Sequence, residues 1–191
     1  MTQEVENDEA YFKEFIEFSD KMSSDSELRA NEPRGDWQMK AQVDEQCVIN
    51  ANSQFWEQML AMTLAPMATP EEFCAAPGHV MGCVNLGGVW KGRIEVRMAE
   101  GLAYQATAAM MMQPLDTVVE ADALDATKEI ANMIAGTIKS SLPRPCTMTV
   151  PESGVEADGF CIPAVTEDSL VVAFRHESGD LMVRVWEEEC P

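Results

Sequence analysis

The stretch Asp122–Leu142, DALDATKEIANMIAGTIKSSL, decides how the rest of the chain is arranged. It contains no proline, and alanine, leucine, lysine and glutamate, which favour helices, occur along it, so a helix is predicted. At about 100° per residue, this helix has an apolar side and a side of acids and amides. The apolar side consists of Ala123, Leu124, Thr127, Ile130, Ala131, Ile134, Ala135, Ile138 and Leu142. The other side consists of Asp122, Asp125, Glu129, Asn132, Gly136 and Ser140. We expect the apolar side to pack in the core and the polar side to face outward.

Three residues of the polar side form a candidate site. Glu129 and Asn132 are separated by three positions, so they are surface neighbours on a helix. Gly136 lies one turn further along, where a glycine costs about 1 kcal/mol relative to alanine. The close approach of another backbone would explain this glycine. Acids and amides on an outer helix face are usually only solvated, so the residues alone leave a functional and a purely structural interpretation open.

Length and composition limit the fold class. A chain of 191 residues, of which 46% are hydrophobic, can form one domain with an extension, or at most two small domains. No apolar run reaches the length of a membrane span, and the acidic N-terminus is unlike a signal peptide. We therefore expect a cytoplasmic protein.

The net charge of −20 restricts the possible partners. Binding to nucleic acid requires clustered lysine and arginine, and anionic membranes attract the same residues. The charge therefore argues against both nucleic acid and membrane surfaces. A partner selected by electrostatics should present a basic patch or a metal ion.

Cysteine and histidine offer little for a metal centre or for covalent catalysis. The six cysteines are widely scattered without a CxxC pair, and the two histidines, His79 and His176, are far apart in the sequence. This pattern argues against a zinc site and favours free thiols in a reducing compartment. It also disfavours Ser-His-Asp or Cys-His hydrolysis, and no metal site is expected.

Residues 1–43 are expected to be an acidic extension that precedes a domain at 44–191. They contain 11 acids and five bases, which gives a net charge of −6. Within them, Asp8–Met22 has the spacing of a short amphipathic helix, followed by a linker. This helix could belong to a flexible arm or fold back on the main domain. Its three phenylalanines favour the second arrangement, because exposed phenylalanines would promote aggregation.

The remaining pattern predicts an α+β fold with a mainly antiparallel sheet. Helices are expected at Asp44–Leu64 and Ala99–Met112, with a proline-containing connection at Ala65–Gly78. Strands are expected at Val80–Leu86, Val89–Met98, Cys146–Val150, Gly159–Val165, Leu170–Phe174 and Leu181–Trp186. Gly87-Gly88 is expected to be the turn of the first hairpin, and PESG, TEDS and ESGD are expected to be turns.

The stretch KEIANMIAGTIKSSL resembles the signature helix of the CheX branch of the CheC/CheX/FliY chemotaxis phosphatases. That family has an acid or serine, three residues, a glutamate, two residues and an asparagine; here these are Asp125, Glu129 and Asn132, followed by Met133 and the small pair Ala135-Gly136. The hairpin VMGCVNLGGVWKGRIEVRM, the helix LAYQATAAMM and the segment VPESGV are also similar to the family. The resemblance covers roughly Glu45 to Trp186 and implies a CheX-like fold with long helices packed on one face of the sheet.

The resemblance implies that the protein hydrolyses the aspartyl phosphate of a CheY-like receiver domain. In this family the asparagine orients the attacking water and the glutamate pairs with the receiver's active-site lysine. Carried over, Asn132 positions the water and Glu129 docks the receiver, with Asp125, Met133 and Gly136 at the contact. The receiver supplies Mg²⁺, so the phosphatase needs no cofactor of its own.

Other features of the chain modify what the resemblance implies. The first predicted helix lacks a second Glu-x2-Asn, which resembles the one-site CheX type, and CheX proteins pair their sheet edges in a homodimer. The connection to Pro151 is shorter than in the family, and the extension 1–43 has no counterpart there. A non-catalytic adaptor that binds a receiver domain or a motility component is therefore the alternative function.

Overall fold

The computed structural model describes residues 43–70, 73–161 and 169–187. The helices of this part are α2 (Glu45–Leu60), α3 (Glu100–Met111) and α4 (Glu120–Lys139), with a 3-10 turn, η2 (Leu115–Thr117). Its strands are β1 (Ala65–Pro66), β2 (Cys74–Ala75), β3 (Val80–Gly88), β4 (Gly92–Met98), β5 (Cys146–Met148), β6 (Glu152–Val155), β7 (Phe160–Cys161), β8 (Ser169–Arg175) and β9 (Leu181–Glu187).

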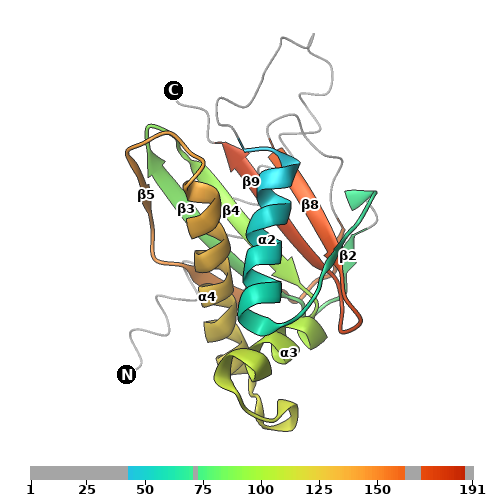
Figure 1. The fold of residues 1–191 in the computed structure, drawn as a ribbon. Helices are drawn as coiled ribbons and strands as arrows, with labels where there is room; N and C mark the ends of the chain where they lie inside the picture. The colour runs from blue at the N-terminus through green and yellow to red at the C-terminus, as the bar shows by residue number, and fades with distance from the viewer. Residues whose placement is uncertain (1–42, 71–72, 162–168, 188–191) are drawn as a thin grey trace. The chain divides into compact units, whose positions relative to one another are not determined.

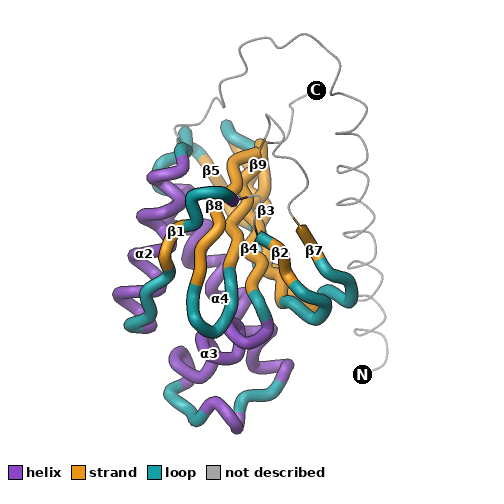
Figure 2. Tube along the Cα trace, turned by 90° about the vertical axis from the view of Figure 1, so that its right-hand side faces the viewer, coloured by secondary structure: helices purple, strands orange, loops and turns teal. Residues whose placement is uncertain are grey.

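Seven of the strands form one antiparallel sheet. Their order is β1-β8-β9-β4-β3-β5, and β6 pairs with the first half of β3 while β5 pairs with its last residues. Helices α2 and α4 run alongside each other over one face, with α3 beneath them (Figure 1). Strands β2 and β7 form a separate two-stranded sheet on the opposite side (Figure 2). The predicted α+β class, with helices packed on one face of an antiparallel sheet, is confirmed.

Helix α4 has the two sides that its sequence indicates. Ile130, Ala131, Ile134 and Ile138 are fully buried in the main core, and the helix packs on β3. It begins two residues earlier than predicted, where the Asp122 carboxylate accepts a hydrogen bond from the Val119 N–H (3.4 Å). It ends at Lys139, three residues earlier than predicted. Leu142 lies beyond that end and is still buried.

The two neighbouring helices also follow their hydrophobic pattern. The Asp44 carboxylate caps α2 by accepting a hydrogen bond from the Cys47 N–H (2.8 Å), a common way for a helix to begin. Val48 and Phe55 are buried, but Met59, which has the same spacing, is 62% exposed. Helix α3 matches its predicted bounds to within a residue.

The predicted turn of the first hairpin is wrong. Gly87 and Gly88 both lie within β3, and the chain reverses at Val89–Lys91 before β4 begins. Gly88 alone of the two has a positive φ (+125°), and a Cβ there would stand 2.2 Å from the Pro145 oxygen. This glycine therefore allows the segment before β5 to approach β3 closely.

Two predicted irregular segments contain strands. The expected connection at 65–78 contributes β1 and β2, and PESG forms β6 with its last three residues instead of a turn. Cys74 of β2 is disulfide-bonded, so the expected free thiol is wrong at this position. Its Cα partner across the two-stranded sheet is Cys161. Cys47, Cys83 and Cys146 are free thiols.

A buried polar cluster lies on the sheet face opposite the helices. The predicted alternation in β4 puts Arg93, Glu95 and Arg97 on this face, and all three are buried. The Arg97 guanidinium pairs with the Glu95 carboxylate, lies 3.0 Å from His79 Nε2, and is 4.1 Å from the centre of the Phe160 ring. Buried charges must find such partners, because burying an unpaired charge is costly.

Some predictions fall outside the described residues. These are the extension 1–43 except for Val43, its helix Asp8–Met22, and most of the strand Gly159–Val165 and the turn TEDS. Within the described ranges, no helix combines the length and the apolar character that crossing a membrane requires.

Candidate functional site

The candidate site is the outward side of α4. Glu129 and Asp125 are exposed, and Asn132 and Gly136 are partly exposed. Ile130, which lies between Glu129 and Asn132 in the sequence, is fully buried, so packing in the core fixes the position of this turn. Within the described residues, neither the Glu129 carboxylate nor the Asn132 amide has a hydrogen-bond partner in the protein. Both groups are therefore available to a ligand or partner that approaches this side.

Gly136 leaves a gap on the same side. A Cβ built at this position would meet no heavy atom within 4 Å in the described part of the chain. Packing among the described residues therefore does not require this glycine, whereas it does require Gly82 of β3. Another molecule could bring its backbone close to α4 here.

Met133 lies at the edge of this surface. Its side chain is partly buried and packs against the main core. Only part of it is available to a partner, and its sequence-predicted place at the contact stays a prediction.

One charged side chain beside the candidate site was not singled out by the sequence analysis. The Lys128 ammonium lies 3.2 Å from the Asp125 carboxylate, on the same side of α4. Lys128 precedes Asn132 by four residues, so the two side chains are neighbours. The i, i+4 spacing was visible in the sequence, but the ion pair needed the structure.

The elements around α4 hold its orientation. Helix α2 runs antiparallel to it, with Cys47 Sγ 3.5 Å from Ser141 Oγ at one end. Strand β6 contacts α4 on the other flank. Thr127 and Thr137 donate hydrogen bonds to carbonyl groups one turn earlier, so their hydroxyls are satisfied within the helix (2.7 and 3.1 Å). The helix therefore presents its outer side in a defined direction.

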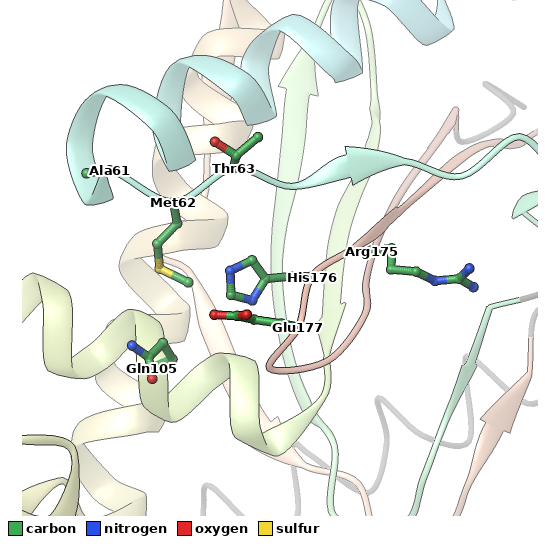
Figure 3. A pocket seen from close by; sticks show the side chains of 7 residues that line it. All are labelled: Ala61, Met62, Thr63, Gln105, Arg175, His176 and Glu177. Atoms are coloured by element: carbon green, nitrogen blue, oxygen red, sulfur yellow. The ribbon is translucent and has the colours of Figure 1, made fainter.

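A second candidate is a groove of about 640 Å³ between the C-terminal end of α2, the middle of α3 and the β8–β9 turn, lined by Ala61, Met62, Thr63, Gln105, Arg175, His176 and Glu177. Figure 3 shows the Arg175 side chain pointing away from the others, and its guanidinium lies 3.7 Å from Asp180. His176 Nδ1 accepts a hydrogen bond from the Ser178 N–H (3.1 Å), which stabilises the β8–β9 turn. The polar side chains of Arg175 and His176 therefore have a structural role in the β8–β9 turn.

The buried titratable groups lie in the polar cluster. His79 Nδ1 is 3.0 Å from the Ala76 carbonyl, and burial lowers the pKa of this imidazole. Burial raises the pKa of the Cys83 thiol to about 12, so it stays protonated at neutral pH. Within the described ranges, no group of three or more His, Cys, Asp and Glu side chains could hold a metal ion.

Comparison with solved structures places the fold among chemotaxis proteins. Chemotaxis protein CheX from Vibrio vulnificus matches with a TM-score of 0.61 and 18% identity, over 75% of this chain and 95% of that one. A CheX from Desulfovibrio desulfuricans matches with a TM-score of 0.58 and 21% identity, over 75% of this chain and 97% of that one. The CheX-CheY-BeF3-Mg complex from Borrelia burgdorferi matches with a TM-score of 0.55 and 18% identity, over 75% of this chain and 97% of that one. No curated protein matches the chain.

The family assignment rests on the sequence as well. Residues 80–175 match the family model "Chemotaxis phosphatase CheX". This range covers just over half of the chain and contains β3, β4, α3, all of α4 and the strands up to β8. The helix that carries Glu129 and Asn132 is thus at the centre of the matched region, and the chain belongs to the CheX family of chemotaxis phosphatases.

Proposed function

We propose that this protein hydrolyses the aspartyl phosphate of a CheY-like receiver domain, with Glu129 and Asn132 as its catalytic pair. The observation that carries the proposal is that both side chains are available on the outer side of a helix whose other side is buried. Family membership supports the reaction, and a CheX from Borrelia burgdorferi has been solved together with CheY, BeF3 and Mg.

Asn132 has the chemistry needed to position water. An amide both donates and accepts hydrogen bonds, so it can hold one water in line with the bond between phosphorus and the aspartyl oxygen. The water oxygen attacks phosphorus while the bond between phosphorus and the aspartyl oxygen breaks. The electron pair of the broken bond stays on the receiver's carboxylate. No general acid is required, because a carboxylate is already a good leaving group.

Glu129 has the chemistry needed to dock the receiver. A carboxylate that has no partner among the described residues can form a charge-assisted pair with a lysine of the receiver. Such a pair fixes the position of Asn132 relative to the phosphoryl group. In this proposal Mg²⁺ and most of the charge stabilisation come from the receiver, and Asp125, Met133 and Gly136 complete the contact.

The test is phosphate release from a phosphorylated CheY-like receiver of the same organism, with the full chain. Wild type should accelerate release, and Asn132→Ala should lower the rate at least about 100-fold, as expected for a lost positioning group. Asn85→Ala removes an amide on the sheet face opposite α4 and should keep the wild-type rate.

Thermal melts of both variants show whether folding is preserved. Asn132 is partly exposed, so its stability change should stay within about 0.5 kcal/mol. If wild type binds the receiver with no acceleration of release, the phosphatase proposal fails and the adaptor function replaces it. If wild type neither binds the receiver nor accelerates phosphate release, both the phosphatase and the adaptor function fail.

We also propose a homodimer. The proposal rests on the edge-to-edge pairing that the resemblance to CheX proteins implies; in the described sheet, β1 forms one edge, and β5 and β6 form the other. Light scattering after size-exclusion chromatography should give about twice the chain mass of 21.1 kDa. A monomeric mass at micromolar concentration would rule the dimer out.

A further inference from the structure

Lys128 lies closer to Asn132 along α4 than any other base of this helix. Its Nζ is 3.2 Å from Asp125 Oδ1, and both side chains are solvent-accessible, at 43% and 73% exposure. Lys128 precedes Asn132 by four residues, and the only other base of α4, Lys139, follows Asn132 by seven. Residues four apart are adjacent on a helix surface, so the ammonium and the amide belong to one surface.

The other charged residues in the part of α4 before Asn132 are acidic. Glu120, Asp122, Asp125 and Glu129 all precede it in α4. A phosphorylated aspartate carries negative charge, so an acidic side alone would repel the group that it must approach. A base beside the water-positioning amide offsets this repulsion where the reaction takes place.

The ion pair with Asp125 can be exchanged. Exposed pairs of this kind contribute little to stability because water screens both charges. The lysine side chain extends about 6 Å from its Cα, and four residues of helix rise by about 6 Å. The ammonium can therefore leave Asp125 and reach the space above the Asn132 amide with no change in the backbone.

We propose that Lys128 is a third catalytic residue, which leaves Asp125 when the receiver docks and donates hydrogen bonds to an oxygen of the phosphoryl group. This inference rests on the proposed phosphatase function. The water oxygen forms its bond to phosphorus, and the electron pair of the breaking bond goes to the receiver's aspartate. The water proton leaves with inorganic phosphate or to solvent. Lys128 stays protonated and stabilises the charge on the phosphoryl oxygens.

The test compares Lys128→Gln, Lys128→Arg and Lys139→Gln in single-turnover dephosphorylation of the receiver. Lys139→Gln is the matched control, since it removes the same charge from the same helix, roughly 10 Å from Asn132. Binding of each variant to the receiver with beryllofluoride and Mg²⁺ separates docking from chemistry. Thermal melts report the fold, which an exposed lysine should not disturb.

Lys128→Gln should lower the single-turnover rate at saturation at least about tenfold, with a smaller change in the dissociation constant. Lys128→Arg should restore most of the rate, and Lys139→Gln should match wild type. A wild-type rate for Lys128→Gln, or an equal loss for Lys139→Gln, overturns the role of Lys128 and leaves the phosphatase function intact. An inactive wild type refutes the phosphatase function and this inference with it.

Discussion

The side chain of Thr127 occupies the space that a Cβ on Gly82 would need. Such a Cβ would stand 2.9 Å from Thr127 Cγ2, 3.0 Å from the Thr127 carbonyl oxygen and 3.1 Å from the Ala131 Cβ. Helix α4 therefore rests directly on the backbone of β3. The position of Glu129 and Asn132 depends on this contact, because the same turns of α4 carry both.

Gly82→Ala should destabilise the protein and displace the site. The added methyl overpacks the contact between α4 and β3, which should lower the free energy of unfolding in urea by about 1–3 kcal/mol. Phosphatase activity measured below the unfolding transition should fall as well. Gly87→Ala is the control in the same strand, since its nearest contact is Thr147 Oγ1 at 3.3 Å. Equal costs for the two variants would contradict the special role of Gly82.

Substitution of Gly136 should separate stability from docking. Gly136→Ala should raise the free energy of unfolding by about 1 kcal/mol, because alanine favours the helix and nothing in the described chain obstructs its methyl. Gly136→Arg should also fold, yet it should weaken receiver binding measured by calorimetry. If Gly136→Arg binds the receiver as tightly as wild type, no backbone approaches α4 at this position.

Reversal of the charge at Glu129 should weaken docking. Glu129→Lys places two like charges together if the receiver offers a lysine, so the dissociation constant should rise at least about tenfold. Asp158→Lys makes the same change in charge in the exposed loop that leads to β7 and should bind like wild type. Binding is measured with beryllofluoride and Mg²⁺ on the receiver. An equal effect of both substitutions would point to net charge in place of a specific pair.

Stability should decrease at acidic pH because of His79. Burial is the main cause of its lowered pKa, and the neighbouring Arg97 guanidinium lowers the pKa further. As the pH falls below about 6.5, the unfolded chain binds a proton that the folded chain does not, so folding loses free energy. Carboxylates also titrate on acidification, so the comparison requires His79→Gln. Between pH 7 and 5.5, wild type should lose more unfolding free energy than this variant.

Cys83 should resist alkylation in the folded protein. Its thiol has a pKa of about 12, mainly because of burial, and its sulfur accepts a hydrogen bond from Arg93 (3.0 Å). Since the thiolate is the reactive form, iodoacetamide at pH 8 should modify Cys83 only after unfolding. Mass spectrometry of peptides locates the label. Modification of native Cys83 as fast as that of the less buried Cys146 would contradict this burial.

The periodic parts of the sequence predicted the structure well. The two sides of α4, the bounds of α3 and the β8–β9 hairpin follow from apolar residues at regular spacing. Strands β1 and β2 have two residues each, which is too short to show alternation, so they were predicted as a connection. Gly87 and Gly88 carry the usual composition of a hairpin turn. Close packing against the Pro145 carbonyl explains the glycine at 88.

The environment of β4 was not predictable from its own residues. Its polar positions alternate as a solvated face would, yet they are buried. Apart from Glu95 of the same strand, the groups that contact Arg97 come from distant segments: His79 lies before β3, Glu156 follows β6 and Phe160 belongs to β7. Likewise, helical spacing put Glu129 beside Asn132, but the reach of the Lys128 side chain to Asp125 appears only in three dimensions.

The place of β3 in the sheet has a consequence for the entropy of docking. β3 is paired with β4 on one side and with β5 and β6 on the other, and α4 lies against it. Amide groups of such a strand should be among the last to exchange with solvent, because they open only when the domain unfolds. The helix that carries the candidate pair is thus ordered when the protein folds. In the proposed complex a receiver would meet a surface that is already ordered, and little of its binding energy would be consumed in ordering α4.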